Sequence, residues 1–338
     1  MDLLPVYITA DTIEGLRMPL TEGGIHNIEE TRDAYELAEL LKHSACVIID
    51  KDISEIDLAE LYRSNPLLAH LISGGNGRKR IEFQPEEHKR IRVGGLAGVA
   101  AHPSTQYFSK ELSKEETARM ENVSGMLHHS LKTSNKSLGR IFRTHIEYFR
   151  KNRIASYDTI LSRLLPHHSI AIIDPYLLRW DNAHLLKFLI HAKPKGVHYY
   201  YITLIFSPDT VTNKQMDPEK WITARIDYLR KELYQKFGKA NIRLEHLVVK
   251  NDEFHDRMIL TNNQTIFQGY GMSTMNQDGE GKKLTTWIYV SHAKTEVAEQ
   301  GHAGCHFINI RDITDAIKEW RKNAEPYSSK ELKNPILT

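Results

Sequence analysis

The feature that most constrains the fold is an alternation of short apolar runs with amphipathic segments in the second half of the chain. The apolar runs have the length of buried strands and cover 169–173, 199–206 and 242–249. The segments between them, 183–192 and 218–237, carry apolar residues at helical spacing. Strands that alternate with helices favour a layered α/β sheet whose strands run parallel.

The longer of the two helices has clear start and stop signals. Asp217 can cap its first turn, and Pro218 suits the first helical position, where no backbone N–H is needed. Gly238 can adopt the left-handed conformation that ends many helices. These signals predict a helix over 218–237.

A hairpin follows the third strand. The runs 255–261 and 265–269 flank Asn262 and Asn263, which suit a tight turn. If these two residues form the turn, Arg257 faces Gln268 across the hairpin. His255 then faces Tyr270, and its side chain points to the same face as that of Arg257 because strand side chains alternate. A further strand over 285–290 and a closing helix over 313–323 complete a mixed sheet flanked by helices.

Polar residues follow the strands at one edge of this expected sheet. Ligands of α/β sheets bind beyond the carboxyl ends of parallel strands, where Asp174 and Ser207 lie. The connection from the strand 242–249 is short, so the hairpin should start at the same edge and run antiparallel. The second strand of the hairpin then runs back to this edge and brings the 269–273 loop there. We therefore expect Asp174, Ser207, His255 and this loop to meet.

These residue types suit phosphodiester chemistry. Histidine can act as nucleophile or general base, arginine presents a planar fork to phosphate oxygens, and a glycine-rich turn exposes backbone N–H groups to an anion. The candidate catalytic residues are His255 and Asp174. The candidate phosphate-binding residues are Arg257, Ser207, Gly269, Tyr270, Gly271 and Ser273.

At these positions the sequence resembles the phospholipase D-like superfamily, whose motif is His-x-Lys-x4-Asp-x6-Gly-(Ser/Gly)-x-Asn. His255, Arg257, Asn262 and Gly269 fall at the His, Lys, Asp and first Gly positions. The His255-Asp256-Arg257 triplet is also similar to that of the phospholipase D-like, membrane-binding domain of MIT-domain proteins. The resemblance covers about residues 160–310. It implies a phosphate-recognising α/β domain.

The departures from the motif weaken the case for family catalysis. Active members combine two motifs, and this chain carries one, so a homodimer would have to supply the second. Arg257 can hold phosphate but cannot move protons, and Asn262 removes a carboxylate. We therefore expect a protein that binds a phosphate or phosphodiester of nucleic acid or nucleotide. The alternatives are an active nuclease or phosphodiesterase that uses His255, a membrane-surface or scaffold adaptor, and a purely structural His-Asp-Arg network.

The first half of the chain carries weaker structural signals than the second half. We expect an α/β or α+β region over 1–105, a helical connector with a basic face over 106–155, and the phospholipase D-like domain over 156–338. Basic residues that could contact nucleic acid, or simply form a solvated face, are Arg78, Lys79, Arg80, Arg140, Arg143, Arg150 and Lys151. The pairs His128-His129 and His167-His168 are expected at exposed loop or helix-end positions.

Composition limits the remaining function classes. The net charge of +2 argues against a generally polyanion-binding surface, so any nucleic-acid contact must be a local patch. Only Cys46 and Cys305 are present, and no apolar run approaches the ~20 residues of a membrane span, which favours a cytoplasmic protein. His302, Cys305 and His306 lack a second ligand pair, so we expect no metal and no cofactor. A role as a microbial defence or accessory protein would fit such a chain.

Overall fold

The chain forms two compact units, 1–143 with 291–295 and 144–290 with 296–338. The computed structural model describes residues 4–15, 41, 45–52, 60, 63, 81–86, 88–89, 106–109, 113–121, 127–130, 145–149, 161–179, 181–210, 217–250, 257–268, 285–292 and 310–337. Within these ranges no helix has both the length and the apolarity needed to cross a membrane.

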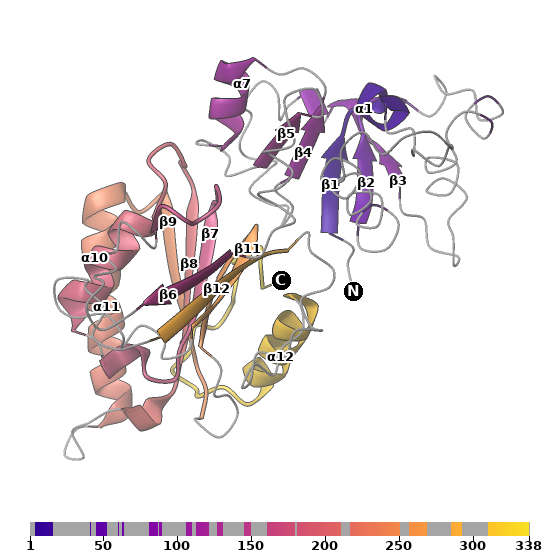
Figure 1. Cartoon of the computed structure of the whole chain (residues 1–338). Helices are drawn as coiled ribbons and strands as arrows, with labels where there is room; N and C mark the ends of the chain where they lie inside the picture. Colours follow the sequence, from indigo (N-terminus) through magenta and orange to yellow (C-terminus); the bar gives the residue numbers. More distant parts are fainter. Residues whose placement is uncertain are drawn as a thin grey trace. The chain divides into compact units, whose positions relative to one another are not determined.

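The N-terminal unit is built on a five-stranded sheet in which all neighbouring strands run parallel (Figure 1). Its elements are β1 (Leu4–Ile8), α1 (Ala10–Gly15), β2 (Ala45–Ile49), β3 (Ile81–Phe83), β4 (Gln106–Ser109), α7 (Lys114–Arg119) and β5 (Leu127–Ser130). The strand order is β3-β2-β1-β4-β5. The chain therefore builds outward from β1 to β3, and then returns to the other side of β1 to add β4 and β5, as in doubly wound α/β sheets.

The central strand β1 and its neighbour β2 are buried on both faces. Val6, Tyr7 and Ile8 on β1 are fully buried, as are Val47 and Ile49 on β2. Short runs of consecutive apolar residues are typical of parallel strands covered on both sides. The expectation of an α/β or α+β region over 1–105 is thus met by an α/β arrangement, which extends beyond residue 105.

The C-terminal unit has a mixed seven-stranded sheet of order β6-β12-β11-β10-β7-β8-β9 (Figure 1). Its strands are β6 (His145–Phe149), β7 (Ser169–Ile173), β8 (Tyr200–Phe206), β9 (Ile242–Val248), β10 (Met258–Thr261), β11 (Gln264–Gln268) and β12 (Thr285–Ser291), and its longer helices are α10 (Asn182–Ala192), α11 (Pro218–Phe237) and α12 (Ile310–Lys322). The neighbours β7, β8 and β9 are parallel, whereas β10 runs antiparallel to both β7 and β11. The expected βαβαβ order and the hairpin are confirmed.

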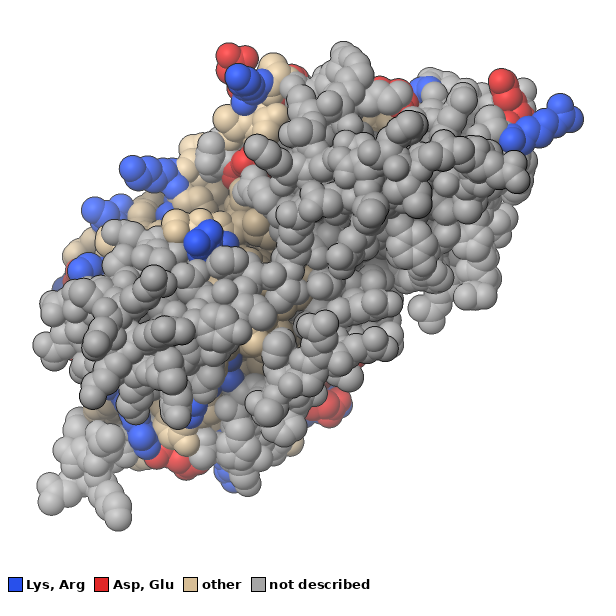
Figure 2. All heavy atoms as spheres, in the orientation of Figure 1, with Lys and Arg blue, Asp and Glu red and all other residues tan. Residues whose placement is uncertain are grey.

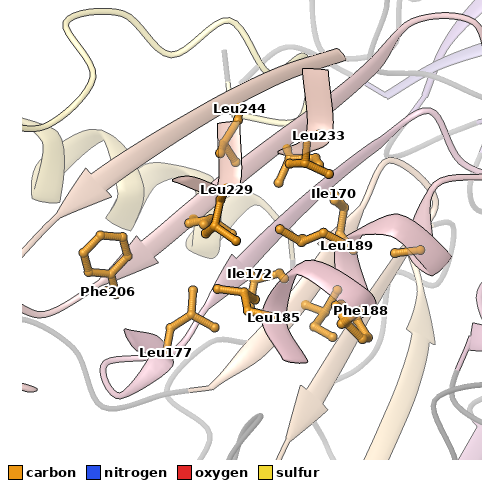
Figure 3. Packing of buried hydrophobic residues seen from close by; sticks show 14 of the residues in the cluster. Ile170, Ile172, Leu177, Leu185, Phe188, Leu189, Phe206, Leu229, Leu233 and Leu244 are labelled. Atoms are coloured by element: carbon orange, nitrogen blue, oxygen red, sulfur yellow. The ribbon is translucent and has the colours of Figure 1, made fainter. Parts of the chain in front are cut away.

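Helices cover both faces of this sheet, with α10 and α11 on one side and α12 on the other (Figure 1). Strand residues that alternate in sequence divide between the two cores: Ile170 and Ile172 face α10 and α11, whereas Ala171 and Ile173 face α12. Figure 3 shows the first core, in which Phe188 of α10 and Leu229 of α11 pack with strand residues, and both side chains are fully buried.

The edge strand β9 is covered by the chain that follows α12. The backbone N–H groups of Glu325 and Ser329 donate to the carbonyls of Val248 and His246, at 2.9 Å each. In return the N–H of Val248 donates to Ser328 Oγ at 3.0 Å, and the N–H of His246 donates to Ser329 Oγ at 2.9 Å. The segment therefore satisfies a strand edge that would otherwise be open to pairing with another chain.

The prediction of a helical connector over 106–155 is wrong. The described residues there include three strands, 106–109 and 127–130 in the first sheet and 145–149 in the second, and one short helix, Lys114–Arg119. Ser113 and Glu116 form a capping box that starts this helix. Short apolar runs fit a helix stripe and a buried strand equally well. Here the outcome was decided by parallel pairing of β4 with β1 and of β5 with β4, and by antiparallel pairing of β6 with β12.

Candidate functional site

Strand register brings Asp174 and Arg257 together at the carboxyl edge of β7. Ile173, the last residue of β7, pairs with Met258, the first residue of β10. In an antiparallel ladder the next pair outward is Asp174 and Arg257. Their side chains form an ion pair in which Arg257 Nε lies 3.6 Å from Asp174 Oδ1. The Asp174 side chain is 1% exposed and that of Arg257 is 22% exposed, so the arginine connects a buried carboxylate to solvent.

Asp174 is held by the turn that it starts. Its Oδ1 accepts a hydrogen bond from the backbone N–H of Tyr176 at 2.9 Å, a local side-chain bond typical of aspartate in turns. Its own N–H donates to the carbonyl of Ile205 on β8 at 3.0 Å. The turn continues into a 3-10 helix, Leu177–Arg179, with Leu177 and Leu178 buried. Contacts within the protein alone therefore hold the Asp174 carboxylate in place.

The ring of Tyr176 lies near two guanidinium groups. The Cζ atom of Arg179 is 4.5 Å from the ring centroid, and the Cζ atom of Arg257 is 5.0 Å from it. Both distances allow cation–π attraction. The two cations are no farther apart than the sum of these distances, which is within the Debye length of about 10 Å at 0.1 M salt. Asp174 compensates the charge of Arg257, and the exposed Arg179 adds a second positive charge.

Ser207 lies at the end of β8 and shapes the same edge. It is fully buried, and its N–H donates to the carbonyl of Pro175 at 3.2 Å. Its hydroxyl donates to Asp209 Oδ2 and accepts from the N–H of Asp209, both at 3.2 Å. The bond to Pro175 joins the ends of β7 and β8, and the bonds to Asp209 lie within the turn after β8. They also place a carboxylate, Asp209, at this edge, and direct contact between Ser207 and phosphate stays a prediction.

The hairpin has the register that its sequence indicated. Gln268 N–H donates to the carbonyl of Arg257 at 2.9 Å, so these two residues face each other. His255 and the loop residues Gly269, Tyr270, Gly271 and Ser273 lie outside the described residues, and their place at this edge stays a prediction. The basic residues Arg78, Lys79, Arg80, Arg140, Arg143, Arg150 and Lys151 also lie outside the described residues, and their contact with nucleic acid stays a prediction.

Asn262, at the Asp position of the motif, lies at the opposite end of β10 from Arg257. Its Oδ1 accepts from the backbone N–H of His168 at 2.8 Å and from that of Ser169 at 3.3 Å. Asn262 therefore joins the hairpin turn to the start of β7 and is remote from the Asp174–Arg257 edge.

His167 and His168 are buried, contrary to the exposed positions expected for them. Their exposed fractions are 3% and 2%. His167 Nδ1 donates to the carbonyl of Leu165 at 2.8 Å, which leaves Nε2 to accept from the Tyr200 hydroxyl at 2.9 Å. Burial lowers the pKa of His167 to about 4, and burial together with the neighbouring His167 lowers the pKa of His168 to about 4. The apolar run that follows directly, 169–173, was the signal for this burial.

Sequence reasoning missed the parts that Tyr176 and Arg179 play at the edge. Both follow Asp174 within one turn, so an aromatic residue and an arginine directly after a strand-ending aspartate were the available signal. On the face shown in Figure 2 the described basic side chains lie as separate spots, with acidic side chains among them.

Neither a protein-family model nor a curated protein matches this chain. Among solved structures the chain is similar to TrmBL2, an archaeal chromatin protein described as showing a novel mode of DNA binding. The TM-score is 0.29 at 13% sequence identity, over 57% of this chain and 56% of the TrmBL2 chain. The match spans little more than half of either protein, and a similarity at this TM-score assigns neither fold nor function.

Proposed function

We propose that the edge formed by Asp174, Tyr176, Arg179 and Arg257 binds a phosphate group of a nucleic acid or nucleotide. The observation that carries the proposal is the pair of guanidinium groups beside one tyrosine ring, with a single buried carboxylate holding one of them. Guanidinium groups bind phosphate oxygens through parallel N–H donors, and an arginine fixed in advance by a carboxylate loses less conformational entropy on binding.

The charge arrangement favours an anion over a cation. Two positive groups held near each other repel, and an anion placed between them relieves that repulsion. Asp174 is enclosed and already bound by Arg257 and by the N–H of Tyr176, so it acts as a positioning residue. Asp209 opposes an anion from the end of β8, where its carboxylate accepts a hydrogen bond from the Ser207 hydroxyl. We expect the phosphate on the Arg179 side of the edge for this reason.

A degenerate phospholipase D-like identity for residues 156–338 belongs to the same proposal. It is supported by the His255, Arg257 and Gly269 spacing and by a mixed sheet in which an antiparallel hairpin adjoins parallel strands. In that identity His255 would contact the reacting phosphate, and Arg257 would stabilise its negative charge in the transition state.

Binding is tested by fluorescence anisotropy with a short labelled single-stranded DNA, its duplex and an RNA of the same sequence, across a salt series. We expect binding that weakens as salt rises. Arg257→Gln and Arg179→Gln should each weaken it by about tenfold or more, because each removes a charge-assisted hydrogen bond. The matched control is Arg230→Gln, a partly exposed arginine of α11 whose guanidinium pairs with Asp227 at 2.6 Å.

The proposal fails if none of the three nucleic acids binds at low salt, or if Arg257→Gln and Arg230→Gln change affinity equally while both variants remain folded at the temperature of the binding assay. Hydrolysis is measured separately with bis(p-nitrophenyl) phosphate. If the chain is a phosphodiesterase, His255→Ala abolishes turnover and leaves the melting temperature unchanged. Turnover that survives His255→Ala would exclude this mechanism, and binding without turnover would make the edge a recognition site.

A further inference from the structure

The two ends of the parallel strands in the C-terminal sheet differ in charge. The strands β7, β8 and β9 are entered through the segments 161–168, 193–199 and 235–241, whose sequences contain neither aspartate nor glutamate. The basic side chains of these segments are Arg163, Lys193, Lys195, Lys236 and Lys239. At the other end, the described carboxylates that follow β7 and β8 are Asp174, Asp181, Asp209, Asp217 and Glu219. Because the whole chain has a net charge of only +2, the entry segments concentrate positive charge at one edge, called here the amino edge.

Backbone hydrogen bonds hold the three entry segments side by side. The N–H of Tyr201 donates to the carbonyl of His168 at 3.2 Å, which joins the starts of β8 and β7. The N–H of Tyr200 donates to the carbonyl of Asn241 at 2.9 Å, which joins the starts of β8 and β9. The exposed cations of these segments are Arg163, Lys195, Lys236 and Lys239. Their charges therefore belong to one surface.

Two tyrosines lie on the same edge. The ring centroids of Tyr199 and Tyr201 are 5.0 Å apart, and the ring planes are inclined at 58°. Tyr199 is 40% exposed, so one of its ring faces can meet a ligand. Tyr201 pairs in register with Arg243 of β9, and the two side chains therefore share a face of the sheet. The Arg243 side chain is 34% exposed and adds a guanidinium group beside the rings.

The carboxylate nearest to these groups is enclosed. The Glu245 side chain is 3% exposed and forms an ion pair with Arg243 Nε. It also accepts from the backbone N–H of Lys333 at 2.8 Å and from that of Asn334 at 3.2 Å. Beside it, Lys333 and Glu331 form an exposed ion pair at 3.2 Å. Glu245 therefore presents little negative charge to solvent, and the exposed cations of the entry segments are not cancelled by it.

Exposed aromatic rings among cations favour a single-stranded nucleic acid as the ligand. Bases of a single strand stack on aromatic side chains while the phosphates meet positive charge, whereas a duplex keeps its base faces covered. A lipid surface fits less well. Within the described part of the chain, the large hydrophobic side chains that are exposed are two tyrosines, Tyr199 and Tyr228, and neither supplies the aliphatic anchor of a membrane-bound segment.

We propose that the amino edge binds a single-stranded nucleic acid, with one base stacked on Tyr199. The phosphates on either side of that base contact Lys195, Lys239 and Arg243. The seven residues of β8 separate this surface from the phosphate edge at Asp174 by about 20 Å. The inference goes beyond the function proposed for the phosphate edge and does not depend on it.

Fluorescence anisotropy of the full chain with a labelled oligothymidylate, which does not self-pair, tests the stacking contact. Tyr199→Ala should weaken binding about tenfold, because one stacked base is lost. Tyr199→Phe keeps the ring and should bind like the parent. The matched control is Tyr228→Ala, since Tyr228 of α11 is exposed to the same 40% and should leave the affinity unchanged.

The salt dependence of the same binding tests the phosphate contacts. Each phosphate contact on a single strand contributes about 0.7 to the slope of log affinity against log salt, so Lys195→Gln/Lys239→Gln should flatten that slope by about 1.4. The control is Lys318→Gln/Lys322→Gln, which removes the same charge from exposed positions of α12 and should keep the parent slope.

The proposal is overturned if Tyr199→Ala, still folded at the assay temperature, binds like Tyr228→Ala, or if the two double-lysine variants have the same slope. It is also overturned if the matching duplex binds as tightly as the single strand. Sedimentation with phosphatidylserine-containing vesicles, without oligonucleotide binding, would make the edge a membrane surface and overturn the proposal as well.

The variants of the phosphate edge keep the two proposals distinguishable. If Arg257→Gln and Arg179→Gln leave the affinity unchanged while Tyr199→Ala lowers it, the function proposed for the phosphate edge fails and the amino edge is the binding surface. In the reverse case the amino edge fails alone. Losses in both sets of variants support two separate contacts with nucleic acid.

Discussion

The Nε atom of Arg257 lies 3.6 Å from the Oδ1 atom of Asp174, and the carboxylate of this pair is almost wholly buried. Removing one partner of a buried ion pair costs more than the pair itself contributes, because the other charge stays in a low-dielectric setting. We expect Arg257→Leu to lower the free energy of unfolding by about 2–4 kcal/mol. Asp174→Asn, which keeps an acceptor for the Tyr176 N–H, should cost about 1–2 kcal/mol.

Urea unfolding of both single variants and of the double variant measures this coupling. The double variant should cost less than the two single costs added, by about 1 kcal/mol. The pair Arg230–Asp227, in which the arginine is partly exposed and the aspartate exposed, is the control cycle, and its coupling should be about 0.5 kcal/mol or less. Equal coupling energies in the two cycles would show that burial of Asp174 does not strengthen its interaction with Arg257.

The buried histidines predict a loss of stability in acid. His167 and His168 have a folded pKa of about 4 against 6.5 in the unfolded chain, so the unfolded state binds protons first as pH falls. Their contribution is fully present above pH 6.5 and is lost as pH falls toward about 4. As pH falls through this window, each histidine lowers the free energy of unfolding by roughly 3 kcal/mol. Urea unfolding at several pH values measures this change.

A variant isolates the His168 part of this effect. His168→Leu should flatten the pH dependence, because leucine does not titrate and the ring nitrogens of His168 make no hydrogen bond within the described residues. His191→Ala, an exposed position on α10, is the control and should leave the slope unchanged. If His168→Leu does not alter the slope of the free energy of unfolding against pH, the acid sensitivity comes from other groups.

Asn334 predicts a stability effect in the core of the C-terminal unit. Its side chain is fully buried, and Nδ2 donates to the carbonyl of Ile170 at 3.1 Å and to Thr203 Oγ1 at 3.0 Å. Asn334→Ala removes these two hydrogen bonds from the core, together with the bond from the Ile336 N–H to Asn334 Oδ1, and should cost about 2–3 kcal/mol. Chemical denaturation measures the change against Asn323→Ala, at an exposed position. A cost below that of the control would show that water replaces the lost donor.

Gly238 predicts a backbone effect at the end of α11. Its φ is 85°, and a Cβ there would lie 3.3 Å from Asn241 Nδ2. Gly238→Ala should lower the free energy of unfolding by about 1 kcal/mol, because an L side chain is strained in this conformation. Lys239→Ala, the exposed next residue, is the comparison in thermal melting. A melting temperature for Gly238→Ala equal to that of Lys239→Ala would contradict the prediction.

Local signals in the sequence determined most elements of the C-terminal unit. Asp217, Pro218 and Gly238 act within one turn of a helix end, and they predicted the bounds of α11. The pairing of Arg257 with Gln268 followed from a turn at Asn262 and Asn263, since a short hairpin fixes its own register. These predictions succeeded because each depends on residues that are neighbours along the chain.

The sequence by itself thus determined the α/β class, the succession of elements along the chain from β7 to β11, and the polar edge that includes Asp174. Only the tertiary structure decided that β10 lies beside β7, which sets Arg257 against Asp174, that Tyr176 lies near two guanidinium groups, that His167 and His168 are buried, and that 106–155 holds strands. The physical reason is that strand neighbours and burial depend on the packing of segments distant in sequence, and an apolar run has the same local pattern whichever partner covers it.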